Sequence, residues 1–381
     1  MTATPRTRGG LPRPRTATFV DARSWVFWCS IALAIGAFAQ VAPLILESFV
    51  ANPASGALSA ALWIAYGLVF ATSVYLLELY ERRPVVNVLG ALAWGAVVAV
   101  GVSRIGGPAM HTIVGDWLGE DSPWISAIAA PLVEEPLKAL GIVALALIPG
   151  ARIRTVADGA FYGAMVGLGF QVVEGFLYTA RTAALSGDAM DIVWQMFVLR
   201  GIVAGLWSHA AFSAIAGAGI AFFFVSTAAT WRRWGVAIGS LAAAMILHGF
   251  LNSPLIHGSQ FTAALIKGVP IVIVLATTVH VGRLRERAVF ARMARVTVPD
   301  YLVSPADFEG LSTRGRRRHA RHDMNDRHGP QAARDLHRLQ RAQLALLVAA
   351  HTDGMISARA ADAAGRVTRA RSALAWSVAG R

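Results

Sequence analysis

The sequence has few charged residues, a single cysteine and almost no lysine. Asp, Glu, Lys and Arg make up 15% of the 381 residues, whereas soluble globular domains average about 25%, so the composition argues against a soluble enzyme. The lone Cys29 excludes an internal disulfide framework and a metal site built from several cysteines. The 36 glycines and 16 prolines have no period, which excludes a collagen-like chain. Only two of the 35 basic residues are lysine, Lys138 and Lys267.

Long apolar runs fill most of the chain instead. Hydrophobic residues make up 55% of the sequence, and the mean hydropathy is +0.53. A helix that crosses a membrane needs about 20 apolar residues. We therefore predict an all-α, polytopic membrane protein with about eight transmembrane helices, over residues 24–46, 58–79, 84–103, 124–148, 157–180, 201–226, 235–256 and 261–281.

Arginine in the short loops predicts the orientation, because positively charged loops are retained in the cytoplasm. The loops after the even-numbered spans hold the arginine clusters, which are Arg82, Arg83, Arg152, Arg154, Arg232, Arg233, Arg283, Arg285 and Arg287. The alternate loops hold few arginines. Both termini are therefore predicted to be cytoplasmic. No clean signal-peptide cleavage site follows the first apolar run, so we expect this run to be retained as a span.

Three regions follow from this pattern: a basic cytoplasmic arm (1–23), a transmembrane domain (24–281) and an Arg-rich cytoplasmic tail (282–381). The tail holds 19 arginines against 9 acidic residues, which accounts for +10 of the net charge of +13. Basic segments beside a membrane typically contact anionic lipid headgroups, and we expect this of the tail. Its segment Arg314–Arg321 lacks the interleaved aromatic residues of nucleic-acid-binding surfaces, so no nucleic-acid partner is expected.

Several ionisable or polar side chains interrupt the apolar spans, where they are costly and by default mark function. They are Glu134, Glu135 and Lys138 in the fourth span, Glu174 in the fifth, His209 in the sixth, and His248 and Asn252 in the seventh. At about 1.5 Å per residue, each of these four helices places one such group between the midplane and the outer face of a core about 30 Å thick. Polar groups from four helices at one depth predict a single site.

The spacing of these residues predicts which of them share a helix face. Lys138 follows Glu134 by four residues, so the two are expected to form an ion pair. His248 and Asn252 are also four apart and share a face. Glycines recur at every fourth position of the fifth span, at 159, 163 and 167, and predict close packing against a neighbouring helix.

This set of residues suits hydrolysis of a peptide bond. A carboxylate in apolar surroundings is a stronger base than one in water, so Glu134 can activate a water molecule, with Glu135 and Lys138 adjusting its charge. A histidine can share the role of base or protonate the leaving amine, and Asn252 with a neighbouring histidine can stabilise an oxyanion. The chain lacks a G-x-S-x-G motif, and Cys29 lies far from the other groups in sequence, so serine or cysteine catalysis is not expected.

Zinc is the alternative to metal-free catalysis. Two histidines and a carboxylate, here His209, His248 and Glu174, are the ligand types of a catalytic zinc. The H-E-x-x-H motif is absent, so these ligands would come from separate helices. We favour glutamate catalysis, which requires no cofactor, over the zinc mechanism.

The motifs resemble those of PrsW-type intramembrane proteases, within the wider superfamily of CAAX prenyl proteases and bacteriocin-immunity membrane proteins. The matching motifs are Glu134-Glu135-x-x-Lys138, Phe170-x-x-x-Glu174, His209 and His248-x-x-x-Asn252. They span about 124–256. The CAAX branch has a histidine at the position of Glu174 and an arginine at that of Lys138, so the resemblance is to the PrsW branch and disfavours a prenyl-protein substrate.

The resemblance implies a helical intramembrane endopeptidase in the plasma membrane of a bacterium. Its substrate would be a membrane-anchored protein, such as an anti-sigma factor, cleaved on the outer side. Glu134 would activate the water, and His209 and His248 would assist or bind a metal. Asn252 would help to hold the oxyanion, while Lys138 and Phe170 would support the site.

Two interpretations from other classes remain open. The first is a proton-coupled transporter in which Glu134, Glu174 and the histidines form a relay. Transporters often contain internal repeats, and the two halves of this sequence show none. The second is a non-catalytic immunity or scaffold protein of the same fold, although every motif position holds a residue competent for catalysis.

Overall fold

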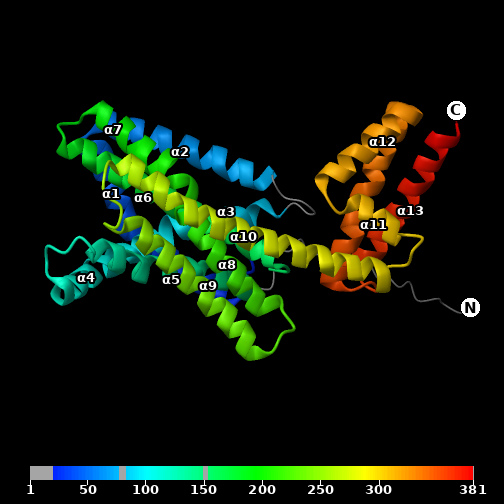
Figure 1. Cartoon of the computed structure of the whole chain (residues 1–381), viewed down its shortest axis with the longest axis horizontal. Coiled ribbons are helices and arrows are strands. Elements are labelled where there is room, and N and C mark those ends of the chain that lie inside the picture. Colours follow the sequence, from blue (N-terminus) through cyan, green and yellow to red (C-terminus); the bar gives the residue numbers. More distant parts are fainter. Residues whose placement is uncertain (1–19, 77–82, 149–152, 381) are drawn as a thin grey trace, which may run out of the picture. The chain divides into compact units, whose positions relative to one another are not determined.

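The computed structural model describes residues 20–76, 83–148 and 153–380, so most of the predicted basic arm lies outside the described residues. Within these ranges all regular elements are helices (Figure 1). They divide into two compact units, one that ends at Ala288 and one that begins at Val289. We call them the membrane unit and the C-terminal unit. Each has its own hydrophobic core.

Six helical stretches among the described residues are long and apolar enough to cross a membrane. They are α1 (Trp25–Ala51), α2 (Pro53–Leu76), the stretch Val85–Leu118, α6 (Val156–Leu185), α9 (Thr230–Asn252) and α10 (Gln260–Val296). The stretch Val85–Leu118 comprises α3 (Val85–Ala93), the π-helical η1 (Trp94–Ala99) and α4 (Val100–Leu118). Large apolar side chains such as Phe38, Leu68 and Ile246 are exposed on these helices, as lipid-facing surfaces require. The predicted all-helical, polytopic membrane protein is confirmed.

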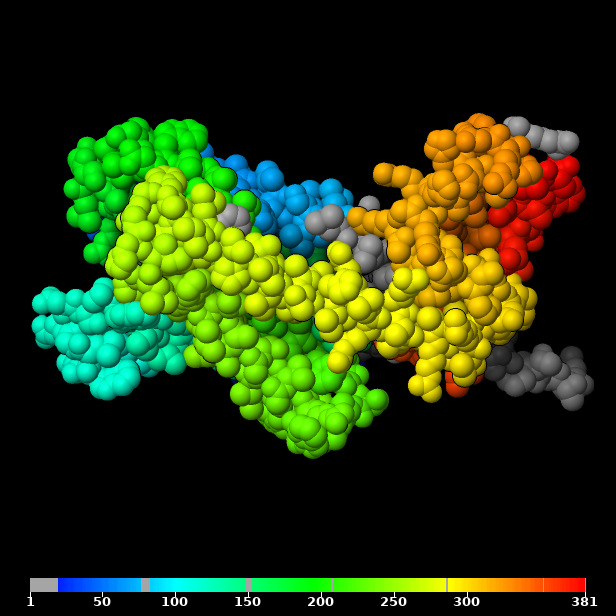
Figure 2. Space-filling model, in the orientation of Figure 1, coloured from blue at the N-terminus to red at the C-terminus, as the bar shows by residue number. Residues whose placement is uncertain are grey.

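Two of the eight predicted spans coincide with other helices. One is α5 (Ile125–Leu147), which is 23 residues long and contains the three ionisable residues of the fourth predicted span. The other is α8 (His209–Val225), which has 17 residues. The number of eight crossings and the cytoplasmic position of both termini therefore stay predictions. Figure 2 shows α10, in yellow, at the surface of the membrane unit.

The sixth predicted span, 201–226, is not one continuous α-helix. The chain passes from α7 (Met190–Phe197) through the π-helical η2 (Val198–Val203) and the 3₁₀-helical η3 (Gly205–Trp207) before α8 begins. Ser208 separates η3 from α8, with φ −101° and ψ −122° outside the helical region. The break places His209 at the first residue of α8. Apolar composition continues across the break, which is why the sequence predicted a single helix.

Helix α6 lies at the centre of the membrane unit and packs closely against α8. A Cβ on Gly163 would overlap the backbone of Ser213, and a Cβ on Gly167 would overlap the carbonyl of His209. Only glycine allows this approach of two backbones. The predicted role of the regularly spaced glycines is confirmed, and the contact fixes His209 against α6.

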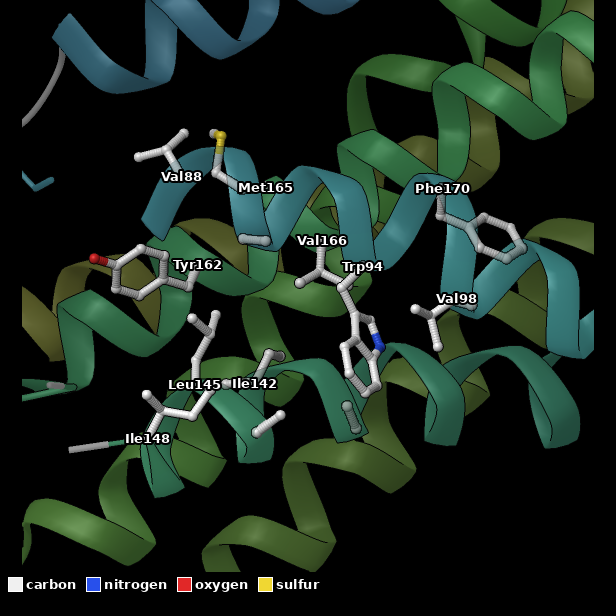
Figure 3. Close-up of a cluster of buried hydrophobic side chains, with 14 of the residues drawn as sticks. Val88, Trp94, Val98, Ile142, Leu145, Ile148, Tyr162, Met165, Val166 and Phe170 are labelled. Atoms are coloured by element: carbon white, nitrogen blue, oxygen red, sulfur yellow. The ribbon is translucent and has the colours of Figure 1, made fainter. Parts of the chain in front are cut away.

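The main hydrophobic core of the membrane unit joins α3, η1, α5 and α6 (Figure 3). Trp94 is buried in it, and its indole N–H donates a hydrogen bond to the carbonyl oxygen of Leu137, 3.0 Å away. The indole also fills the space beside Gly141, where a Cβ would overlap the ring. These contacts hold the turn of α5 that contains Lys138.

The C-terminal unit is a folded helical unit, whereas the sequence predicted a polar, Arg-rich tail with one amphipathic stretch, at about 335–351. It contains α11 (Pro305–Leu311), α12 (Arg314–Asp353) and α13 (Ala358–Ala379). A kink at Gly329, whose φ is 76°, divides α12. Apolar side chains dispersed among the arginines form its core, among them Phe290, Leu302, Val303, Phe308, Leu311, Leu339, Leu346, Leu347 and Val367.

Candidate active site

The predicted polar groups of α5, α8 and α9 meet around the ammonium of Lys138. Its Nζ lies 2.6 Å from Glu135 Oε1, 3.0 Å from His209 Nδ1 and 3.6 Å from Glu134 Oε2. His248 Nδ1 lies 2.8 Å from the same oxygen of Glu135. The side chains of Lys138 and Glu135 are fully buried. We call these five residues the central cluster.

The two adjacent glutamates differ in their surroundings. Glu135 is the closer partner of Lys138, whereas the sequence had predicted the pair with Glu134. Oε1 of Glu135 accepts from both Lys138 and His248. Glu134 is 12% exposed at its side chain, and its Oε2 is buried without a hydrogen-bond partner among the described residues, as is Oε2 of Glu135. Glu135 is therefore held as a counter-ion, while Glu134 is the glutamate whose side chain is partly exposed, although it does not line the cavity described below.

His209 lies between a cation and an anion. An ammonium can only donate, so the contact with Lys138 makes Nδ1 of His209 an acceptor. The proton of the neutral ring is then on Nε2, which lies 3.1 Å from Glu174 Oε2. Arg200 Nη2 contacts the same oxygen of Glu174 at 2.9 Å. Both ring nitrogens of His209 are thus engaged.

Arg200 is a residue of the site that the sequence analysis missed. It lies in the predicted outer loop between the spans 157–180 and 201–226, and no sequence motif includes it. In the structure it lies on η2, 26 residues after Glu174, and its guanidinium also stacks over the ring of Tyr178 at 4.2 Å. The separation along the chain hides this ion pair from spacing arguments.

Aromatic rings enclose the central cluster. Lys138 Nζ lies 4.3 Å from the centre of the Phe170 ring, which is a cation–π distance. The same ring is 5.0 Å from that of His209. Phe212, which the sequence analysis did not identify, stacks on His248 at 5.2 Å with an interplanar angle of 13°. By excluding water, these rings strengthen the electrostatic interactions inside the cluster.

A second set of hydrogen bonds fixes the backbone just before α8. Gln171 Nε2 donates to the hydroxyl oxygen of Tyr66 at 3.0 Å. Ser208 Oγ donates to Gln171 Oε1 at 3.3 Å. These bonds tie α2 and α6 to the residue that precedes His209. Tyr66 and Ser208 belong to no sequence motif, and their buried hydrogen bonds identify them as residues that support the site.

Close packing of α9 on α5 brings His248 to Glu135. Gly249 faces the backbone of α5, and a Cβ there would lie 2.6 Å from the carbonyl oxygen of Ala127. Asn252 ends α9 one turn after His248 and lines a cavity of about 400 Å³ beside the central cluster. The same cavity is lined by Glu174, His209, His248, Arg200 and Lys267, with further residues of α2, α6, η2, α9 and α10. The structure thus provides space for a substrate next to the polar groups.

The central cluster also has the donor chemistry of a metal site. Single ligand atoms of Glu134, Glu135, His209 and His248 all lie within 4.8 Å of one another. Carboxylate and imidazole groups are zinc ligands, and the unpartnered oxygens of both glutamates fit such a role. This set differs from the predicted one, because Glu174 contacts the opposite nitrogen of His209.

The segment that contains these site residues is similar to known proteins. The sequence model of the PrsW family intramembrane metalloproteases matches residues 83–280. Protease PrsW of Bacillus subtilis (strain 168) is 30% identical over 115 residues, which are 30% of this chain and 50% of that protein. The chain thus spans about half the length of this curated relative. No solved structure matches the chain.

Proposed function

Since the chain belongs to the PrsW family of intramembrane metalloproteases, we propose that it is an endopeptidase that hydrolyses a peptide bond of a membrane-anchored protein. One observation carries the proposal. A buried Glu–Lys–His cluster, in which Glu134 and Glu135 each have one oxygen without a hydrogen-bond partner among the described residues, contributes His209 and His248 to the wall of a cavity of about 400 Å³. A carboxylate, cations and an amide beside one cavity are the groups that acyl transfer to water requires.

In this proposal Glu134 is the general base. Its Oε2 has no hydrogen-bond partner among the described residues, and Lys138 lies 3.6 Å away. A water molecule bound there would lose a proton to Glu134 as its oxygen attacks the scissile carbonyl. Glu134 would then pass this proton to the leaving amine. Glu135 stays ionised beside Lys138 and His248 and holds both in place.

His248 and Asn252 would stabilise the oxyanion. Nδ1 of His248 donates to Glu135, so Nε2 can donate to the oxyanion in the protonated form of the ring, in which both nitrogens carry a proton. The amide of Asn252 lines the same cavity from the following turn of α9. His209 is a positioning residue in this scheme, because Lys138 and Glu174 engage both of its nitrogens.

A zinc ion would be held by Glu134, Glu135, His209 and His248. When bound there, zinc would polarise the scissile carbonyl and acidify a water molecule. We retain the glutamate mechanism because Lys138 already brings a positive charge into contact with Glu135 and His209. A metal ion among the same atoms would meet repulsion from this ammonium.

The proposed substrate is a single-span protein of a bacterial plasma membrane, such as an anti-sigma factor. Two observations support this environment: the helices of the membrane unit are long and apolar enough to cross a membrane, and the curated relative is bacterial. The predicted orientation places the site in the outer half of the membrane, so cleavage is expected near the outer surface.

A reconstitution experiment tests the proposal. The purified chain would be placed in proteoliposomes with a panel of single-span proteins, and products would be mapped by mass spectrometry while a trapped dye reports internal pH. We expect cleavage of at least one protein near the outer surface, and its loss in His248→Ala. Proton uptake without cleavage of any protein would instead support the transporter interpretation.

A further inference from the structure

Lys267 is a buried cation in the wall of the cavity beside the central cluster. The residue lies on α10 and is 5% exposed. Its Nζ donates to two backbone carbonyl oxygens at the end of α9, that of Leu251 at 3.1 Å and that of Ser253 at 2.5 Å. These two residues flank Asn252 in the sequence. Lys267 therefore lies beside the proposed oxyanion group.

No carboxylate in the described part of the chain pairs with Lys267. None of the ion pairs among the described residues includes Lys267, whereas Glu174, the carboxylate that lines the cavity, is paired with Arg200 at 2.9 Å. The carbonyl groups at the end of α9 offset part of the charge, since a helix C-terminus carries a partial negative charge. An anion that enters the cavity would pair with the ammonium of Lys267, whose described partners are carbonyl oxygens alone.

We propose that Lys267 binds the carboxylate of an Asp or Glu side chain of the substrate, close to the scissile bond. This inference rests on the proposed function, because it takes the cavity to be where the substrate chain lies. An ammonium has three N–H donors, and two carbonyl oxygens leave one for the substrate. Since Lys267 is bonded to the two residues that flank Asn252, the acidic residue it selects lies within a few residues of the bond that is cleaved.

The predicted outer loops are acidic, so a cation in the cavity contrasts in charge with the surface around it. The predicted outer loops carry acidic residues, among them Glu47, Asp116, Glu120, Asp121, Asp188 and Asp191. An acidic segment of a substrate would be repelled there and attracted at the cavity, where Lys267 and the partly exposed Arg200 lie. The cavity thus distinguishes an acidic segment from a neutral or basic one.

Single-span peptides in nanodiscs test the inference. All peptides share one transmembrane segment and an amidated C-terminus, and a single Asp is moved through the outer juxtamembrane segment, with Asn as the matched neutral residue. We expect kcat/KM for the Asp peptide to exceed that for the Asn peptide by about tenfold at one position, as a charge-assisted hydrogen bond supplies. A Lys residue at this position should give the poorest substrate.

Three variants distinguish two roles of Lys267: selection of an acidic substrate residue and support of the C-terminal end of α9. In Lys267→Gln, whose amide still donates to a carbonyl, the Asp/Asn ratio should fall to about one, whereas Lys267→Arg should retain it. Arg181→Gln, a neutralised arginine exposed elsewhere on the outer side, should leave it unchanged. If Lys267→Gln slows both peptides equally and keeps the ratio, Lys267 only supports α9 and the inference is wrong. Equal rates for the Asp and Asn peptides with the wild-type chain overturn it even if no variant folds.

Binding separates this inference from the proposed function. Fluorescence anisotropy of the same labelled peptides would be measured with Glu134→Gln, alone and combined with Lys267→Gln. If the Asp peptide binds more tightly than the Asn peptide and this difference requires Lys267, the carboxylate site is supported. If the wild-type chain nevertheless cleaves no peptide, the proposed protease function is rejected. Cleavage by the wild-type chain without any preference for Asp in rate or binding would reject the inference alone.

Discussion

Lys138 contacts a carboxylate, an imidazole and an aromatic ring while its side chain is fully buried. The compact ammonium fits among these groups, whereas a planar guanidinium presents its donors in a fixed fork. The sequence predicted that this lysine belongs to the site, because it lies within one turn of two glutamates. It did not predict that Glu135 is the nearer partner, since both spacings place a carboxylate on the same face.

Replacement of Lys138 by Met is expected to destabilise the membrane unit. The change leaves Glu135 as a buried carboxylate without its ammonium partner, at a cost of about 3–5 kcal/mol. Thermal unfolding in detergent would measure this loss of stability, with Leu140→Met, at an exposed position of the same helix, as the control.

We also expect Lys138→Arg to lose activity, because the larger head group displaces His209. Full activity and stability in Lys138→Arg would show that only the charge is needed.

Removal of metal tests the glutamate mechanism at the same residues. Because Lys138 supplies the positive charge of the central cluster, we expect cleavage to continue at an unchanged rate after treatment with a strong chelator. Elemental analysis of the purified chain accompanies the assay. If the chelator abolishes activity, zinc restores it and a mock-treated sample keeps it, the zinc mechanism would replace the glutamate mechanism.

At the scale of elements, apolar runs predicted the long helices, and regular glycines predicted that the fifth span packs closely on a neighbouring helix, which is α8. The break at Ser208 was not predictable from composition, which reports neither the backbone angles of Ser208 nor its hydrogen bond to Gln171 on a different helix. The same limit applies to Arg200 and Tyr66, whose partners are 26 and 105 residues away along the chain. Sequence patterns report neighbours along one helix, and these contacts join separate helices.

The packing of α6 on α8 predicts the effect of a single methyl group. Gly163→Ala places a Cβ against the backbone of Ser213, and we expect a loss of about 1–3 kcal/mol of unfolding free energy together with reduced cleavage. Gly36→Ala on α1 is the matched control, since a Cβ there meets nothing within 4 Å. Unfolding curves in detergent compare the two. Equal stability of both variants would contradict the close contact.

At the scale of the whole molecule, the arginine distribution predicted an orientation, and the composition predicted a membrane domain followed by a tail. The core of the C-terminal unit was missed because its apolar side chains are dispersed among arginines and form no long run. The expected contact of these arginines with anionic lipid stays a prediction, as does the wider CAAX and bacteriocin-immunity superfamily. Family membership follows from a match over residues 83–280.

Cysteine labelling tests the predicted orientation. In a Cys29→Ala background, a membrane-impermeant maleimide should label Glu120→Cys from outside intact cells and should not label Asp300→Cys. Both positions are exposed in the structure, so a difference in labelling reports the side of the membrane. The reverse pattern would place the site in the inner half and exclude cleavage near the outer surface.

Glu134 is the residue proposed to activate the water that cleaves the substrate. The most direct test of this role is the cleavage rate of Glu134→Gln relative to Glu47→Gln, a matched change at an exposed position of α1. Both variants must elute and unfold like the wild-type chain. We expect the rate of Glu134→Gln to fall by at least about 10²-fold, while Glu47→Gln remains at the wild-type rate. A Glu134→Gln variant that cleaves as fast as Glu47→Gln would contradict the assignment.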